Sequence, residues 1–132
     1  MQGTAAEPDA ETDVGRQRVV VDAFLAASRG GDFDALLALL DPDVVVRADR
    51  SAVDIGALSE VRGAAAVAGT FSGRARFAQL ALVDGAPGAV WAPGGMPKVV
   101  FEFTVIDGKI VGIDMVADPE RISELRLTML DD

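Results

Sequence analysis

The 132-residue chain contains no histidine, no cysteine and no tyrosine. Without cysteine it can form no disulfide, no zinc–thiolate site and no thiol nucleophile. Without histidine and tyrosine, it cannot use an imidazole base, a Ser-His-Asp triad or a phenol hydrogen-bond donor. Acid–base chemistry near neutral pH would therefore fall to an aspartate or glutamate with a raised pKa, or to a lysine with a lowered one.

Basic residues and long hydrophobic runs are also scarce. Twelve Lys and Arg stand against 21 Asp and Glu, giving a net charge of −9, and the basic residues are scattered along the chain. Phosphate contacts need clustered Lys and Arg, so nucleic acid and anionic membranes are not expected as direct partners. No apolar run approaches the roughly 20 residues of a membrane span, and the N-terminus lacks a signal-peptide pattern. We therefore expect a cytoplasmic location.

Composition changes once along the chain. Residues 1–13 are small and acidic and include a proline, which predicts a disordered lead-in or linker. Residues 14–132 are enough for a single domain. Apolar residues recur at helical spacing over 14–30, 33–40 and 62–71. The predicted apolar faces are Val20, Ala23, Phe24 and Ala27 in the first helix, Phe33, Leu36, Leu37 and Leu40 in the second, and Ala64, Val67, Ala68 and Phe71 in the third.

The second half of the chain reads as short strands separated by turns. Asp107-Gly108, between two alternating apolar runs, is the strongest hairpin signal in the sequence. The order of elements predicts an α+β fold in which three helices pack on one face of a curved antiparallel sheet and leave a cavity between them. The predicted strands cover residues 43–49, about 76–83, 89–92, 98–106 and 109–116, with a loop at 50–61 and a last short helix starting at 118.

Two aspartates near the C-terminus have different expected roles. Asp118 precedes Pro119 and suits the N-cap of the last helix. If Ile106 lies opposite Lys109, Asp114 falls on the same face as Phe101. A carboxylate in such apolar surroundings could act as a general acid or base, or it could simply pair with an arginine or a backbone amide.

Three segments carry a family resemblance: "VVDAFLAASRGGDFDALLALLDPDVVVRAD", "VRGAAAVAG" and "DGKIVGIDMVADPERI". Over residues 16–130 they resemble the SnoaL-like branch of the nuclear-transport-factor-like, or ketosteroid-isomerase-like, superfamily. This resemblance implies a cone-shaped curved sheet with a cavity. Within the branch, the segments look most like the C-terminal accessory domain of extracytoplasmic-function sigma factors, and the lead-in looks like its linker. The DNA-binding regions of those proteins are missing, so we expect an excised domain or a free-standing protein.

The resemblance also suggests site residues. In SnoaL-like cyclases and epoxide hydrolases the working aspartate of the last hairpin would fall on Met115, one residue after Asp114, and a bulge at Gly112 would change that register. Asp49 ends the first strand near the place of the isomerase base, although a turn role is the alternative. Candidate catalytic residues are thus Asp114 and Asp49, and candidate ligand-binding residues are Trp91, Phe101, Phe103, Met115 and Phe24.

Two functions follow from these observations. The first is a SnoaL-like domain of the sigma-factor accessory type, with a cavity for a small apolar molecule and the transcription machinery as its partner. The second is a free-standing enzyme of polyketide-type metabolism, a cyclase, isomerase or epoxide hydrolase, using Asp114 without a cofactor. Carboxylates are not clustered at ligand spacing, so no metal site is expected. Because many relatives associate through the outer face of the sheet, we expect a homodimer.

Overall fold

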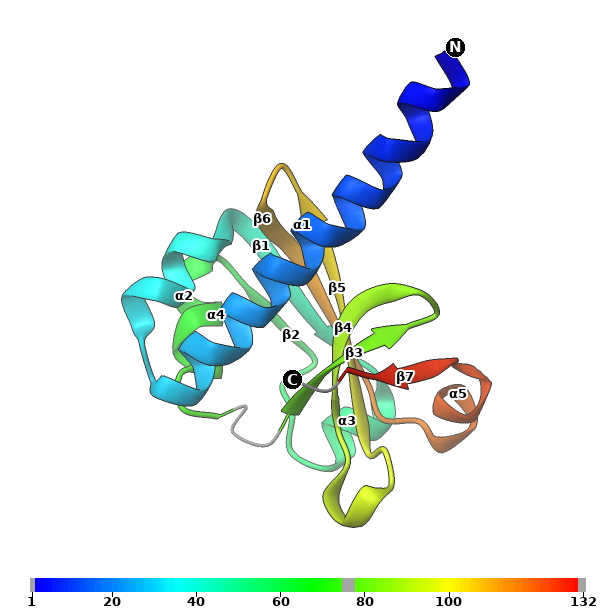
Figure 1. Cartoon of the computed structure of the whole chain (residues 1–132). Coiled ribbons are helices and arrows are strands. Elements are labelled where there is room, and N and C mark those ends of the chain that lie inside the picture. Colours follow the sequence, from blue (N-terminus) through cyan, green and yellow to red (C-terminus); the bar gives the residue numbers. More distant parts are fainter. Residues whose placement is uncertain (1, 75–77, 131–132) are drawn as a thin grey trace.

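The computed structural model describes residues 2–74 and 78–130, with side chains from Val14 onward (Figure 1). Within these residues, seven strands form one curved sheet in the order β2-β1-β6-β5-β4-β3-β7. The sheet is antiparallel except for β1 and β6, which run parallel. The strands are β1 (Leu40–Ala48), β2 (Glu60–Arg62), β3 (Ala78–Val83), β4 (Ala86–Trp91), β5 (Val99–Ile106), β6 (Lys109–Val116) and β7 (Leu127–Met129).

Helices lie on both faces of this sheet. Figure 1 shows α1 crossing in front of the strands, with α2 and α4 beside it. The apolar residues of these helices and of the inner face of the sheet form one hydrophobic core. On the outer face, Ile122 of α5 packs in a second cluster with Val100 and Val116. The predicted α+β class is confirmed. The helices are α1 (Gln2–Gly30), α2 (Phe33–Leu39), α3 (Arg50–Asp54), α4 (Ala64–Phe71), the 3-10 turn η1 (Pro93–Gly95) and α5 (Pro119–Glu124).

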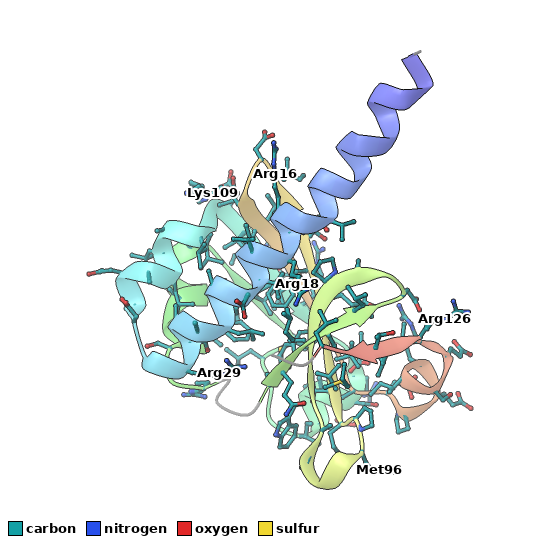
Figure 2. All side chains as sticks on the ribbon, in the orientation of Figure 1. Arg16, Arg18, Arg29, Met96, Lys109 and Arg126 are labelled. Carbon is teal, nitrogen blue, oxygen red and sulfur yellow. The ribbon has the colours of Figure 1, made fainter. Side chains whose placement is uncertain are left out.

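The first two helices form the predicted hairpin. Gly31 has a φ of +66°, the left-handed conformation that ends α1 without steric cost. Asp32 then caps α2, where its carboxylate accepts a hydrogen bond from Ala35 N at 3.1 Å. At the other end of α2, Lys109 Nζ donates to the carbonyl of Ala38 at 2.6 Å (Figure 2). The Lys109 hydrogen bond attaches the helical hairpin to the β5–β6 hairpin.

The segment expected to be a linker continues the first helix. Met1 lies outside the described residues, and the backbone of residues 2–13 belongs to α1. This part of the helix, dark blue in Figure 1, projects away from the body of the domain. A linker role for residues 1–13 stays a prediction. None of the helices in the described ranges is long and apolar enough to span a membrane.

Two Asp-Gly turns close the hairpins of the sheet. The predicted turn at Asp107-Gly108 is present, with φ angles of 52° and 78°. Asp84-Gly85 repeats this geometry, with 51° and 87°, so β4 starts earlier than expected. Positive φ at both central residues is typical of the type I′ turns that match the twist of paired strands. The expected strand start near 76 lies outside the described residues.

An aromatic cluster joins the helices to the inner face of the sheet. The ring of Phe24 from α1 lies 5.2 Å from that of Phe71 in α4 and 5.4 Å from that of Phe103 in β5. Phe71 in turn lies 6.3 Å from Phe101, and all three pairs meet edge to face. Such contacts add to the stabilisation from burying the rings. Phe33, expected on the apolar face of the second helix, is instead exposed.

The interval 50–61, expected to be a loop, is partly regular. It contains α3 and the start of β2, which pairs with β1. Leu40 begins β1 instead of ending α2, and β7 adds an edge strand beside β3 that was not expected. These elements are short, so their formation depends on capping and pairing partners far along the chain more than on local periodicity.

Two glycines in the sheet have different steric surroundings, which gives a matched test of the packing. A Cβ added at Gly88 would lie 2.6 Å from the carbonyl oxygen of Phe101, whereas at Gly112 it would meet nothing nearer than 3.8 Å. We expect Gly88→Ala to lower the free energy of unfolding by about 1–3 kcal/mol and Gly112→Ala to change it by less than about 1 kcal/mol. Urea denaturation of both variants measures the difference, and equal losses would contradict this packing.

Candidate functional site

The pairing of β5 with β6 contains a bulge. Next to the turn, Val105 lies opposite Ile110, as the sequence predicts, but Thr104 lies opposite Gly112. One residue of β6, Val111, is therefore extra in the pairing. A glycine inside a strand often accompanies such a bulge. Since successive side chains alternate between faces, the extra residue moves every later side chain of β6 to the opposite face.

Asp114 lies on the outer face of the sheet as a result. It pairs with Glu102 and is exposed, while Met115 pairs with Phe101 on the inner face. The expectation that Asp114 shares the face of Phe101 is therefore wrong, because it assumed regular pairing from the turn onward. The bulge brings Met115 to the inner face. Met115 stands where the resemblance places the working aspartate, so this position carries no carboxylate.

Charged side chains form a row on the outer face. Arg47 of β1 lies beside Asp114 on one side and Glu60 of β2 on the other, with its Nε 3.8 Å from a Glu60 oxygen. Asp114 has Glu102 as its other neighbour. Two like charges directly opposite one another repel, and the adjacent arginine offsets this repulsion in part. This row is a ladder of charges in which Glu60, Arg47 and Asp114 are exposed and Glu102 is half-buried.

Asp49 holds together backbone segments distant in the sequence. As the N-cap of α3, its carboxylate accepts a hydrogen bond from Ala52 N at 2.8 Å. The same carboxylate accepts from Ala117 N at 3.0 Å and Asp118 N at 3.1 Å. Both oxygens are thus bonded to backbone amides between β6 and α5 and at the start of α3. The expected capping role of Asp118 is confirmed, since its carboxylate accepts from Glu120 N at 3.3 Å.

Two adjoining pockets open on the inner face of the sheet, beneath α3 and the segment that follows it. They have volumes of about 340 and 280 Å³, and Ala57, Arg74, Phe101 and Met115 line both. We call them the inner pockets. The first is also lined by Ala52, Ile55, Ala78, Trp91 and Val99, and the second by Val46, Gly56, Leu58, Val61, Thr70 and Phe71.

The structure brings together three of the five expected ligand-binding residues. Trp91, Phe101 and Met115 line the inner pockets. Phe24, only 1% exposed, and Phe103 contact each other in the aromatic cluster and line neither pocket.

The sequence analysis missed the residues that cover the inner pockets. Ile55 and Leu58 line them while remaining 62% and 65% exposed. Large apolar residues in a segment expected to be a loop were the available signal for this role. Arg74, which follows α4, was also missed.

The inner pockets have an apolar wall with almost no reactive chemistry. Of the described residues lining them, Arg74 is the only ionisable one, and none carries a carboxylate. Over residues 14–74 and 78–130, whose side chains the structure describes, no group of three or more Asp or Glu side chains could hold a metal ion. Such a site suits binding of an apolar molecule, since hydrophobic walls with few polar groups are typical of ligand pockets.

Comparison with known proteins gives the class of this domain. No family model matches the chain. It is 32% identical over 121 residues to the ECF RNA polymerase sigma factor SigJ of Mycobacterium tuberculosis, covering 79% of this chain and 38% of that protein. The crystal structure of SigJ superposes with a TM-score of 0.64 and 26% identity, over 92% of this chain and 49% of that one. The chain thus spans less than half of this relative.

Solved structures with lower sequence identity share the fold. An NTF-2 like protein from Burkholderia xenovorans matches with a TM-score of 0.54 and 18% identity, over 85% of this chain and 94% of that one. An LEH-like epoxide hydrolase from M. tuberculosis matches with a TM-score of 0.50 and 24% identity, over 80% of this chain and 85% of that one. The chain therefore has the nuclear-transport-factor-like fold. It is similar to part of the sigma factor SigJ.

The two candidate aspartates should differ in their contribution to stability. Asp49→Ala removes the acceptor of three backbone amides, so we expect a loss of about 2 kcal/mol in the free energy of unfolding. Asp114→Ala, the matched control, removes an exposed charge opposite Glu102 and should change that energy by less than about 0.5 kcal/mol. Urea denaturation measures both values. A larger loss for Asp114→Ala than for Asp49→Ala would contradict these assignments.

Proposed function

We propose that this chain is an accessory domain of the sigma-factor type, which binds a small apolar molecule and modulates transcription by contacting the transcription machinery. Similarity to SigJ supports this proposal, because the match covers most of this chain but only part of that protein. A domain that matches part of a sigma factor is expected to act on the remaining parts or on their partners. We also propose a cytoplasmic location, where transcription takes place.

The inner pockets support the ligand-binding part of the proposal. Their shared lining includes Phe101 and Met115, and Trp91 adds an aromatic wall to one of them. Burying apolar ligand surface against such walls contributes roughly 25 cal/mol per Å². The exposed side chains of Ile55 and Leu58 at the edge of the pockets would be covered in part by a bound molecule.

The enzymatic alternative receives less support from the geometry. It required a carboxylate in the cavity, yet Asp114 lies on the outer face and both oxygens of Asp49 bond to backbone amides. A general base must reach the proton that it removes. Similarity to an epoxide hydrolase at 24% identity concerns the fold alone.

A chimera tests the proposed function. This chain would replace the matching part of SigJ, and transcription from a SigJ-dependent promoter would be measured with a reporter. We expect deletion of that part to change the reporter output, and we expect the chimera to keep the output of intact SigJ. Ala57→Phe, which fills space shared by both inner pockets, should shift the reporter output toward that of the deletion.

The control for that experiment is Ala65→Phe. Ala65 is exposed on α4 and lines neither inner pocket, so this substitution adds the same ring without entering them. It should leave the reporter output of the chimera unchanged. If the unmodified chimera behaves like the deletion, the accessory role is wrong. If Ala57→Phe and Ala65→Phe act alike, the inner pockets have no part in it.

We further propose that the chain forms a homodimer through the outer face of its sheet. The row of charges on that face includes both signs, so a two-fold arrangement can place Arg47 of one copy near Asp114 or Glu102 of the other. Sedimentation at low salt should give twice the mass of the chain. Arg47→Glu should lower that mass because it makes the row wholly acidic. A single-chain mass at every concentration would refute the dimer.

A further inference from the structure

Among the described residues that line the inner pockets, Arg74 is the one that is charged. It lies just after α4 and lines both inner pockets, beside residues that are apolar apart from the hydroxyl of Thr70. The chain as a whole carries 21 acidic residues, yet none of the described ones lines either pocket. The local charge of the site is therefore positive, opposite in sign to the net charge of the chain.

The guanidinium of Arg74 is available for an external partner. The ion pairs found within residues 14–74 and 78–130 are those of Glu60 with Arg47 and with Arg62, and none involves Arg74. An arginine remains charged at any physiological pH, and its planar fork of donors matches the two oxygens of a carboxylate. Pairing with an anion beside an apolar wall is stronger than in open water, because the local dielectric is lower.

We propose that the inner pockets bind an amphipathic anion, with its apolar body against Trp91, Phe101 and Met115 and a single carboxylate paired with Arg74. This inference rests on the proposed function and specifies the chemical class of the ligand. Volumes of about 340 and 280 Å³ suit a molecule of modest size, such as a medium-chain fatty acid or an aromatic acid. A cationic ligand would be repelled, and a neutral one would leave Arg74 unpaired.

Decanoate and decanol form a matched pair of probes, because they share an alkyl chain and differ in the charge of the head group. Isothermal titration calorimetry gives the affinity for each. Trp91 is the only tryptophan, the chain has no tyrosine, and Trp91 lines one inner pocket, so the shift of its fluorescence reports binding there. We expect decanoate to bind roughly three- to tenfold more tightly than decanol, in line with a partly exposed charge pair.

Substitution of Arg74 separates charge recognition from apolar binding. Arg74→Gln should lower the affinity for decanoate roughly three- to tenfold and leave the affinity for decanol unchanged. Unchanged binding of decanol also shows that the pocket is intact. Arg121→Gln is the matched control, since Arg121 is exposed on α5 and lines neither inner pocket. It makes the same change in net charge and should alter neither affinity.

The possible results distinguish the two proposals. Equal affinity for decanoate and decanol, or equal losses in Arg74→Gln and Arg121→Gln, overturns the anionic ligand class and leaves apolar binding standing. Failure of the unmodified chain to bind either probe overturns the ligand class as well as the apolar binding on which it rests. The reporter output of the chimera is measured independently, so the accessory role can succeed or fail whatever the probes do.

Discussion

The register of β6 between its two neighbours decides which side chains meet a ligand and which meet solvent. Pairing with β5 places Met115 opposite Phe101, and pairing with β1 places it beside Ala48. Both ladders put Asp114 on the other face, next to Glu102 and Arg47. Because side chains alternate strictly along a strand, an extra residue in the ladder reverses the facing of all that follow. Everything proposed for the inner pockets depends on this register.

The two ends of the inner face differ in what fills them. At one end, Phe24 packs edge to face against Phe71 and Phe103 and joins the helices to the sheet. Toward the other end, α3 and the segment after it cover the pockets lined by Met115 and Trp91. Asp49 holds the start of α3 to the end of β6 by accepting hydrogen bonds from the amides of Ala52, Ala117 and Asp118. A carboxylate that looked catalytic thus positions the segment that covers the pockets.

This arrangement supports the proposed binding role, on a fold that hosts many functions. Met115 occupies the pocket position to which the resemblance assigns a carboxylate, and among the described residues that line the pockets only Arg74 is charged. A pocket of this kind can recognise a ligand by shape, apolar area and one ion pair. Coupling that recognition to a partner would suit the similarity to part of SigJ.

The sequence by itself determined the α+β class, the first helical hairpin, the Asp107-Gly108 turn and the cap at Asp118, because each depends on local periodicity or on one residue's conformational preference. Only the tertiary structure decided the bulge at 111–112, the parallel pairing of β1 with β6 and the helical turn of α3 over the pockets. These depend on partners that lie far apart in the chain. Asp49 and Ala117, for example, are joined by hydrogen bonds across 68 residues. Whether a carboxylate such as Asp114 lies inside or outside is set by that long-range pairing, which local pattern does not encode.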